Sequence, residues 1–514
     1  MLLQDLLIRT AERKRNKIAY ISNDTAFTWS QINARVNQLC AFLKDLGIKK
    51  GDRVAYFGLD FHQQAEVMFA CAKAGFIRVG VNWRYGEREV NYIFEDSGPK
   101  VLLVDQKTAE LGKKGAKDCS IPFVIGVGEN HGLKHDYETC IRPQPMNEIK
   151  MQHKQNDIIS LCYTTGSTGL PKGAIWTQGN LINSLVNGIL HMGLRKDDIW
   201  MHALPAAGVP IVSMLVNCYW GNTNVLMPYF DPELALRLIE EKKVTAALFV
   251  PTMIQMMTSH PKFDEYDVST LRLITYGSSP MSPTNIVETF NKFNCDLQQW
   301  YGSTENTGAW VSFLDPDEHQ FAIHNNRTDI LASCGRPASH VDIKIVDDNG
   351  VEVPAGQSGE ITIKGDVIVP GYWKDEVKTE RTIRDGWLYT GDIGRFDEEG
   401  RLYLLDRAKF RIITGAYNVF PVEVENVINE HPSVAEVCVV GVPDEKWGEV
   451  VLAEVRLKPN QSVTDSQIIN FCKDKIARYK VPKRIVFVSD FPRGATGKLL
   501  KLEVKNKYQK AVLK

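Results

Sequence analysis

Apolar and polar positions alternate along the chain with two different periods, and these periods predict a layered α/β architecture. From Ser30 to Gly47, apolar residues recur about every 3.6 positions, as in a helix packed on one face. Apolar runs typical of buried strands follow at 53–57, 77–81 and 101–104, separated by helical segments 62–73 and 87–94. Strands that alternate with helices of this length are typical of parallel, doubly wound sheets.

A similar alternation continues from 158 to 274, and the pattern changes near 341. Two short strands, 341–346 and 359–364, flank a turn at 348–350 and predict a small antiparallel β subdomain. Farther on, helices at 422–429 and 466–477 alternate with strands at 434–440, 450–457 and 484–488. We therefore expect a large α/β N-terminal domain over 1–408, with doubly wound layers plus the β subdomain, and a small mobile α+β domain over 409–514.

Composition narrows the classes of protein. The 514 residues carry a net charge of −1, so no basic field favours nucleic acid as a partner. Ten cysteines are scattered without a CxxC pair, which is typical of reduced thiols in a cytoplasmic enzyme rather than of a disulfide framework or a zinc site. We find no secretory signal and no apolar run long enough for an integral membrane segment.

One polar segment follows directly on the apolar run 158–162. Segment 163–173 reads YTTGSTGLPKG and combines glycines, hydroxyls and a lysine that together suit a polyphosphate. It lacks the Gly-Lys-Ser/Thr ending of a Walker A loop. Taken alone, a flexible linker explains it equally well. The candidate phosphate-binding residues are Thr164, Thr165, Gly166, Ser167, Thr168, Gly169 and Lys172.

Five further segments offer groups suited to a nucleotide. They provide a turn at a strand end, aromatic faces, a hydroxyl, carboxylates for ribose or Mg²⁺, and a lysine in a turn-rich loop. Each is commonplace alone, but their joint presence in this order favours one nucleotide site. The candidates are Gly277, Ser278, Ser279 and Pro280; Trp300, Tyr301, Gly302, Ser303, Thr304 and Glu305; Asp392; Arg407 and Lys409; and Lys498.

These segments, in this order and spacing, resemble the signature of the adenylate-forming superfamily over nearly the whole chain. The strings YTTGSTGLPKG and YGSTE are highly specific, and FPRGATGK supports them. The resemblance implies two reactions that use ATP, Mg²⁺ and coenzyme A. A carboxylate first attacks the α-phosphate of ATP to give acyl-AMP and pyrophosphate, and a thiol then attacks the acyl-AMP after the small domain swings.

The resemblance also assigns roles by position. It places 164–172 at the ATP phosphates, 277–280 and Tyr301 at the adenine, Thr304 at the α-phosphate and Glu305 at the Mg²⁺. It gives Asp392 and Arg407 the ribose, Lys409 the hinge, and Lys498 both the carboxylate and the α-phosphate. Positive charge placed where two anions meet stabilises the transition state, and the ionised carboxylate needs no general base.

Three departures from the family pattern stand out. Family members commonly have an aromatic residue and a histidine as an acyl-site gate shortly after Leu-Pro, but Leu204-Pro205 is followed here by Ala-Ala-Gly-Val. His202 lies on the wrong side of Leu204, so we interpret it as structural. Phe410 replaces the usual acid after the hinge, and Ala416-Tyr417 follows Gly415 where Gly-Glu is frequent.

The leading hypothesis is an ATP-dependent acyl-CoA ligase. Segment 441–449 resembles a CoA-packing segment of some family ligases, and Trp447 is either a CoA contact or a core tryptophan. Gly415 is expected to line the pantetheine tunnel. Gly302 leaves the acyl pocket open, and Val209, Tyr229, Phe230, Tyr276 and Trp310 are candidate linings. We expect a medium-to-long aliphatic or an aryl acid.

Two other functions stay open. One is a stand-alone adenylation enzyme that loads a carrier protein. The other, from a different class, is a catalytically silent nucleotide-binding protein, which the intact Lys498, Glu305 and Asp392 disfavour. The expected partners are small molecules, namely the acid, ATP and CoA, and a homodimer is the one assembly considered.

Overall fold

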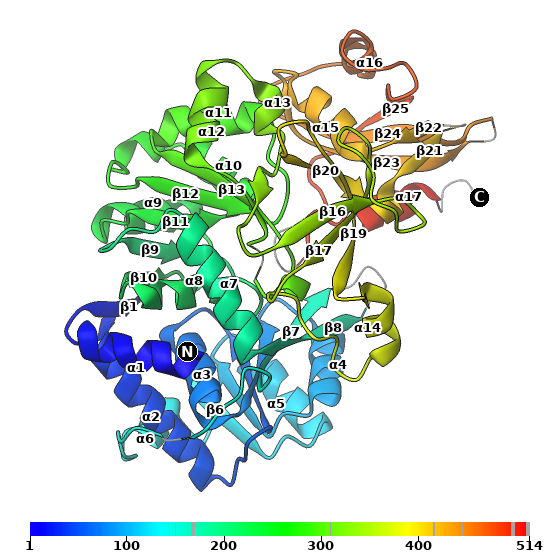
Figure 1. Cartoon of the computed structure of the whole chain (residues 1–514). Coiled ribbons are helices and arrows are strands. Elements are labelled where there is room, and N and C mark those ends of the chain that lie inside the picture. The colour runs from blue at the N-terminus through cyan, green and yellow to red at the C-terminus, as the bar shows by residue number, and fades with distance from the viewer. Residues whose placement is uncertain are drawn as a thin grey trace.

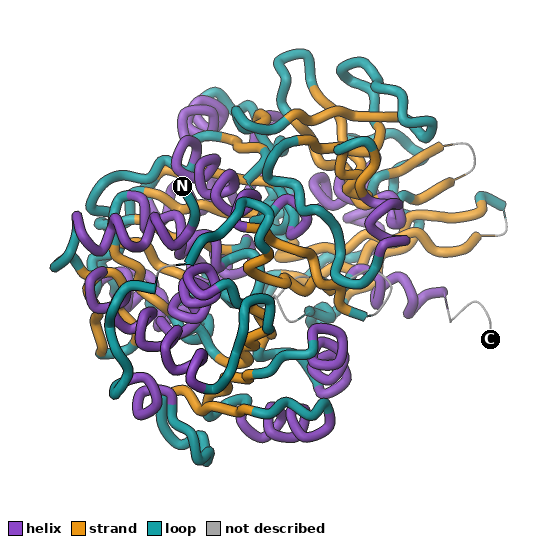
Figure 2. Tube along the Cα trace, turned by 60° about the horizontal axis from the view of Figure 1, so that its bottom comes forward, coloured by secondary structure: helices purple, strands orange, loops and turns teal. Residues whose placement is uncertain are grey.

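The computed structural model of the chain describes residues 1–149, 151–165, 170–308, 310–414, 417–444, 446–494 and 499–509. Its N-terminal part contains two large sheets, and a smaller sheet leads to the C-terminal part at the upper right of Figure 1. Helices flank the strands of the large sheets (Figure 2), as the alternating pattern of the sequence predicts.

The first large sheet has the order β6-β5-β3-β4-β7-β8. Its strands run parallel except β8, which is antiparallel to β7. Parallel strands joined by helices confirm the doubly wound prediction. The elements are β3 (Arg53–Gly58), α3 (His62–Ala74), β4 (Ile77–Asn82), α4 (Glu87–Ser97), β5 (Val101–Asp105), α5 (Ala109–Asp118), β6 (Phe123–Val127), α6 (Tyr137–Ile141), β7 (Ile158–Thr165) and β8 (Pro171–Thr177).

The second large sheet has the order β15-β14-β13-β12-β11-β9-β10-β1-β2, with parallel strands from β13 to β1 and antiparallel strands at both edges. Its strands are β1 (Ile18–Ser22), β2 (Thr25–Thr28), β9 (Ile199–His202), β10 (Thr223–Leu226), β11 (Ala246–Phe249), β12 (Leu273–Gly277), β13 (Asp296–Tyr301), β14 (Ser312–Leu314) and β15 (Arg336–Pro337). The accompanying helices are α1 (Leu3–Arg13), α2 (Trp29–Asp45), α7 (Gln178–His191), α8 (Ile211–Val216), α9 (Pro232–Glu241), α10 (Pro251–Thr258), α11 (Pro283–Phe293), α12 (Pro316–His324) and α13 (Thr328–Leu331).

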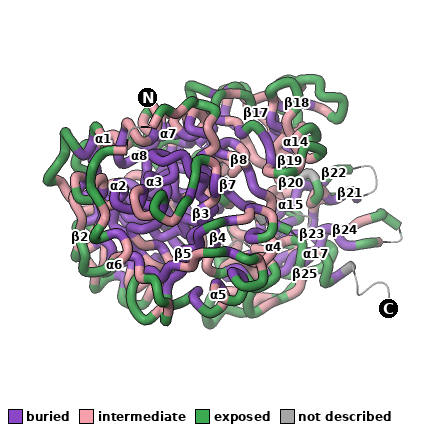
Figure 3. The backbone as a smooth tube through the Cα atoms, turned by 90° about the horizontal axis from the view of Figure 1, so that it is seen from below, coloured by how far each residue is buried: buried purple, intermediate pink, exposed green. Residues whose placement is uncertain are grey.

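Helix α3 lies at the centre of the N-terminal part. Every one of its residues is buried, and Figure 3 shows it among the buried strands of the first sheet. It packs against α1, α2 and α8, and against β3, β4 and β7. A helix that is buried all round needs no polar face, which explains why the segment carries little amphipathic pattern.

The small sheet contains the predicted antiparallel pair. Strands β16 (Asp342–Val346) and β17 (Gly359–Lys364) are antiparallel, and β17 pairs on its other side with β19 (Trp387–Phe396). Strand β19 also pairs with β18 (Ile383–Arg384), which follows α14 (Glu376–Thr382), and with β20 (Leu402–Arg407). These pairings confirm the β subdomain.

The C-terminal part has its own sheet and core. It comprises β21 (Ile412–Thr414), β22 (Tyr417–Val419), α15 (Pro421–Asn429), β23 (Val434–Asp444), β24 (Gly448–Leu457), α16 (Asp465–Lys473), β25 (Arg484–Phe487) and α17 (Lys501–Gln509). Half-buried Lys501 joins it to the small sheet, because its Nζ lies 2.9 Å from carboxylate oxygens of both Asp406 of β20 and Glu425 of α15. The domain boundary at 408/409 stays a prediction.

Several helix ends differ from the sequence prediction, and α4, for example, continues to Ser97 beyond its predicted end at 94. Helix α2 begins at Trp29 and not after Ser30, because Thr28 is the N-cap and its Oγ1 accepts the Gln31 N–H. The Gln31 side chain bonds back to the Thr28 N–H at 2.7 Å, which completes a capping box. Helix α16 ends at Lys473, four residues before the predicted end at 477.

All ten cysteines are free thiols, and eight of them are buried. Burial raises the pKa of several, including Cys40 and Cys162, each to about 12. Among the described residues, none of the helices is both long and apolar enough to cross a bilayer.

Candidate functional site

The two strands that flank the glycine-rich segment form an antiparallel pair. Strand β7 ends at Thr165 and β8 begins at Pro171, with Thr164 opposite Lys172 in the register. The sequence predicted a loop after a strand, and the pairing adds a second strand that carries Lys172. Candidates Gly166, Ser167, Thr168 and Gly169 lie outside the described residues, as does the side chain of Thr165.

Two lysines lie together beside these strands. Burial and the neighbouring Lys378 of α14 lower the pKa of Lys172 to about 8, while Asp375 and Glu305 act in the opposite direction. Two like charges at close range repel each other, and a bound anion relieves that repulsion. The pair therefore forms a cationic site suited to phosphates, and Lys378 is a member that no sequence motif indicated.

Thr304 and Glu305 begin a short 3-10 helix, η3 (Thr304–Asn306), directly after β13. Asn306 closes its first turn by accepting the Ser303 N–H at 2.9 Å. The indole Nε1 of buried Trp176 donates to the Thr304 carbonyl at 3.0 Å, and the Tyr372 hydroxyl donates to Glu305 Oε1 at 2.7 Å. The Glu305 carboxylate is thus held by a tyrosine that sequence reasoning missed.

Asp392 and Arg407 face each other across strands β19 and β20, where they are register partners. Arg407 Nε lies 2.9 Å from Asp392 Oδ1, and the Tyr301 hydroxyl donates to Asp392 Oδ2 at 2.8 Å. Asp392, followed by Glu305, raises the pKa of Arg407, so both carboxylates lie near this guanidinium. Lys409 follows in η4 (Ala408–Phe410), where burial and the Arg407 charge lower its pKa.

The turn after β12 contains the next candidates, with Ser279 and Pro280 at its far end. Ser278 adopts φ +68°, a left-handed conformation that is costly for a non-glycine residue. Gly277 packs directly against its register partner Trp300, since a Cβ built on it would lie 2.6 Å from the Trp300 carbonyl oxygen. The turn is therefore held at the carboxyl edge of the parallel strands, where open α/β sheets bind ligands.

A narrow cavity lies beside this turn. It is lined by Val209, Pro210, Ser213, Leu248, Ser278, Trp300, Gly308 and Trp310. Of the expected acyl-pocket residues, Val209 and Trp310 line it. Tyr276 does not, because it is fully buried and its hydroxyl contacts His319 at 2.8 Å. Phe230 is absent from the lining, and Tyr229 is 51% exposed.

His202 has the structural role that the sequence predicted. It is buried at the end of β9, where its ring nitrogens contact Ser213 Oγ at 3.1 Å and Asn224 Oδ1 at 2.8 Å. Burial lowers its pKa to about 4, so the ring is neutral at pH 7.

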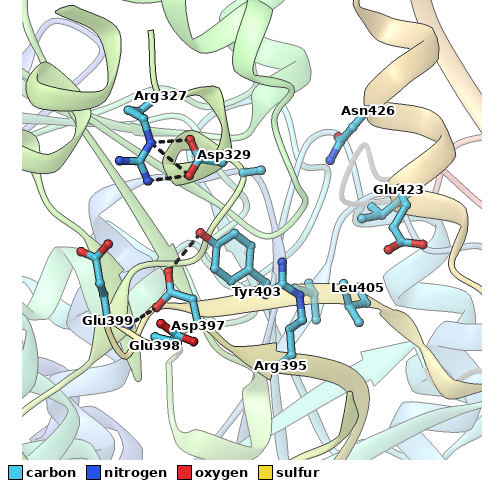
Figure 4. A pocket seen from close by; sticks show the side chains of 13 residues that line it. Arg327, Asp329, Arg395, Asp397, Glu398, Glu399, Tyr403, Leu405, Glu423 and Asn426 are labelled. Atoms are coloured by element: carbon cyan, nitrogen blue, oxygen red, sulfur yellow. Dashed lines mark hydrogen bonds and ion pairs between the residues drawn. The ribbon is translucent and has the colours of Figure 1, made fainter. Parts of the chain in front are cut away.

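A wider cavity of about 490 Å³ lies between the β19–β20 hairpin, α13 and α15 (Figure 4). Some of its polar side chains are paired with one another: Arg327 forms an ion pair with Asp329, and the Tyr403 hydroxyl donates to Asp397. None of the predicted site residues lines it. It is therefore separate from the nucleotide candidates.

Three candidates belong to the C-terminal part. Lys498 and Gly415 lie outside the described residues. Trp447 lies in the turn between β23 and β24 and is 46% exposed, with Lys446 Nζ 5.0 Å from its ring centroid. The alternative of a core tryptophan is therefore wrong.

Comparisons with known proteins identify the family of the chain. The model of the family described as AMP-binding enzyme matches residues 7–373, and that of the AMP-binding enzyme C-terminal domain matches 423–498. The chain is 32% identical to a feruloyl-CoA synthase of Amycolatopsis sp over 503 residues, 98% of each chain. It is also 32% identical to the fatty acid–[acyl-carrier-protein] ligase ScoC of Streptomyces coeruleorubidus over 507 residues, 97% of this chain and 95% of that protein.

Among solved structures, the anthranilate CoA ligase AuaEII in complex with anthranoyl-AMP superposes with a TM-score of 0.92 at 27% identity, covering 100% of this chain and 98% of that one. The family match spans most of the chain, and the relatives are matched over nearly their full length. The chain therefore belongs to the AMP-binding enzyme family, and within the adenylate-forming superfamily it is of the acyl- and aryl-CoA ligase type.

Proposed function

We propose that this enzyme activates a carboxylic acid with ATP to give an acyl-adenylate and then transfers the acyl group to CoA, releasing pyrophosphate and AMP. One observation carries the proposal. The negative charge of Glu305 acts to raise the pKa of both Lys172 on β8 and Arg407 on β20. The segments that carry these three residues are far apart in sequence, and they meet around the Glu305 carboxylate. A polyphosphate with its ribose is a ligand that requires this combination of charges.

We assign the nucleotide contacts as follows. Lys172 and Lys378, with the glycine-rich segment, bind the β- and γ-phosphates, and Thr304 contacts the α-phosphate. Asp392 accepts hydrogen bonds from the ribose hydroxyls, and Arg407 and Tyr301 hold that carboxylate in place. The turn 277–280 and Tyr301 border the adenine.

The first step joins the acid to the α-phosphate. An oxygen of the ionised carboxylate attacks the phosphorus, and the bond to the bridging oxygen breaks as pyrophosphate leaves. Lys498 is proposed to contact both anions and to offset the charge that builds up between them. Lys409 is proposed as the hinge about which the C-terminal part then moves, bringing Gly415 to the pantetheine tunnel and Trp447 to the CoA.

Glu305 fits a magnesium role. Mg²⁺ in nucleotide sites is commonly held by one or two carboxylates together with substrate phosphates, and Tyr372 occupies only one of the Glu305 oxygens. When bound, Mg²⁺ would supply positive charge to the phosphates.

The acid is proposed to be an aryl or a medium-to-long aliphatic acid. Gly302 adds no side chain to the site, and the narrow cavity is lined by Trp300 and Trp310. The cavity volume is about 30 Å³, which suits only a small group, so a larger acid requires the lining to open.

Free thiols suit a reducing compartment, and we propose the cytoplasm.

The test is a screen of carboxylic acids, read by AMP formation and CoA consumption. The expected result is AMP formation that depends on both acid and CoA. Absence of pyrophosphate release with every acid would instead favour a silent nucleotide-binding protein.

A carrier protein is the second candidate acceptor, because one relative is named as an acyl-carrier-protein ligase. Parallel assays with CoA and with a pantetheinylated carrier separate the two acceptors. Transfer to the carrier alone would replace the CoA proposal.

A further inference from the structure

The loop 203–208 joins β9 to α8 and carries the sequence departure at the acyl site. It has Ala206, Ala207 and Gly208 where relatives of this superfamily commonly have an aromatic and a histidine side chain. Ala206 and Ala207 are buried, so the loop is part of the packed interior despite its small residues. Because the side chains of this loop are small, its backbone groups are the polar groups that it can offer to a bound acid.

Two ionisable residues from the first sheet hold this backbone. Fully buried Arg78 of β4 donates from Nη2 to the Ala206 carbonyl at 2.7 Å and from Nη1 to the Ala207 carbonyl at 3.4 Å. Asp60, which follows β3, accepts the Ala206 N–H at 2.8 Å. Gln64 of α3 accepts a further bond from Arg78 Nη2 at 3.0 Å.

The sheet also contacts the loop directly. A Cβ built on Gly80 of β4 would lie 2.0 Å from the Ala207 carbonyl oxygen, so only glycine permits this approach. The loop is therefore pinned on the side that faces β4 by two carbonyl bonds, one N–H bond and a backbone contact.

Peptide geometry fixes what the opposite side presents. In a trans peptide the C=O and the following N–H point in opposite directions. The Ala206 and Ala207 carbonyls point at Arg78, so the N–H groups of Ala207 and Gly208 point away from it. Within the described part of the chain neither N–H has a hydrogen-bond partner. Ala207 is buried and Gly208 is half-buried. Buried backbone N–H groups are nearly always paired, so the unpaired N–H of Ala207 indicates a ligand, and the N–H of Gly208 lies next to it.

The loop leads into the narrow cavity beside the turn 277–280. The next residues, Val209 and Pro210, line this cavity together with Ser278 and Trp300 of the nucleotide candidates. The loop therefore adjoins both the cavity and the nucleotide candidates, and the carboxylate of a bound acid must lie between its hydrocarbon part in the one and the α-phosphate at the other.

We propose that the Ala207 and Gly208 N–H groups form an oxyanion site for the acyl carbonyl, and that Arg78 and Asp60 are the positioning residues that aim them. This inference rests on the proposed function. In the second step the thiolate sulfur attacks the carbonyl carbon, the C=O electron pair moves onto oxygen, and the two N–H groups stabilise that oxygen. The pair then re-forms the C=O as the bond to AMP breaks.

Arginine suits this positioning role better than lysine. Its planar guanidinium reaches two successive carbonyls and Gln64 with fixed geometry, which a single ammonium does not reproduce. Burial raises the pKa of Asp60 to about 8, so at pH 7 Asp60 is mostly the neutral acid and accepts the Ala206 N–H through its Oδ1.

The direct test replaces the amide by an ester. Lactic acid in place of Ala207, or glycolic acid in place of Gly208, removes one N–H and keeps the shape of the chain. Loss of one oxyanion donor typically costs about 10²–10³-fold in rate, and we expect this loss in thioester formation from supplied acyl-AMP. The matched control is glycolic acid at Gly132, an exposed loop glycine, which should leave the rate unchanged.

A second test uses Arg78→Met and Arg78→Lys with binding as the readout. Wild type should bind benzoyl- or hexanoyl-sulfamoyladenosine more tightly than the alkyl analogues that lack the carbonyl. Both variants should lose most of this preference while retaining ATP affinity. The control is Arg53→Met. Arg53 is another arginine of the first sheet, and it donates to the Ser97 and Gly98 carbonyls. This variant should keep the preference for analogues that contain the carbonyl.

The outcomes separate the two proposals. If wild type forms no acyl-AMP from any acid, the proposed function fails. If wild type is active and both ester variants keep the full rate, or if Arg78→Met folds and retains the carbonyl preference, the oxyanion site is overturned. Should the Arg78 variants not fold, the ester variants decide alone.

Discussion

The closeness of Lys172 and Lys378 predicts how ATP affinity depends on pH. In the free enzyme the pKa of Lys172 is lowered from 10.5 to about 8, by burial and by the Lys378 charge. The polyphosphate of ATP favours the protonated form, so its binding raises this pKa. Between about pH 8 and 10, the free enzyme must take up a proton when ATP binds.

The magnitude follows from that pKa. Below pH 8, Lys172 is mostly protonated and the affinity for ATP should be flat. Above it, the protonated fraction falls about tenfold per pH unit, so the KM for ATP at about pH 9 should be roughly tenfold above its value at pH 7. Replacing Lys378 by Met removes the like charge, and the midpoint should move upward toward 10.5, the ordinary pKa of lysine.

The assay is ATP–pyrophosphate exchange across pH, with calorimetry in two buffers of different ionisation enthalpy to count protons. Lys344→Met is the control, because Lys344 pairs with Glu352 on the small sheet and its loss should not move the midpoint. A KM for ATP that is constant from pH 7 to 9.5, or a Lys378→Met midpoint at the wild-type position, would refute the reasoning.

Three further outcomes are expected. Lys498→Ala should lower adenylation by about 10²–10³-fold while thioester formation from supplied acyl-AMP survives, and equal loss in both half-reactions would contradict the domain movement. Gly415→Leu should impair the CoA step alone, which is checked by measuring the two half-reactions separately, and unimpaired CoA transfer in the folded variant would contradict the tunnel. In wild type, each additional buried methylene of the acid should raise kcat/KM about fourfold, which corresponds to about 0.8 kcal/mol. In Gly302→Trp, kcat/KM should stay high only for the short acids near acetate. A wild type that prefers acetate to hexanoate and benzoate would contradict the pocket argument.

The layered fold was predictable because buried parallel strands are apolar along their whole length. The runs at 53–57, 77–81 and 101–104 coincide with β3, β4 and β5 to within a residue. Helix ends were less certain. The capping box at Thr28 uses a threonine and a glutamine that local patterns offer at many positions, and Ser30 was an equally plausible cap.

The candidate site was predictable only where a motif carried it. Asp392 and Arg407 were identified separately from motifs, but only the β19–β20 register makes them neighbours. Tyr372 belongs to no motif and reaches Glu305 because its backbone forms an isolated bridge with Ala174 of β8. Arg78 and Asp60 likewise belong to no motif, and the sequence did not indicate them because they contact a loop more than a hundred residues away along the chain.

The distribution of thiols gives the protein a built-in reporter of its own unfolding. Eight of the ten cysteines are buried in the native state, so a thiol reagent should modify only Cys119 and Cys140 quickly. Reaction at the other eight requires the chain to open, and these sites are distributed over both parts, with Cys438 and Cys472 in the C-terminal part. Mass spectrometry of labelled peptides would therefore show which part opens first, without any engineered probe.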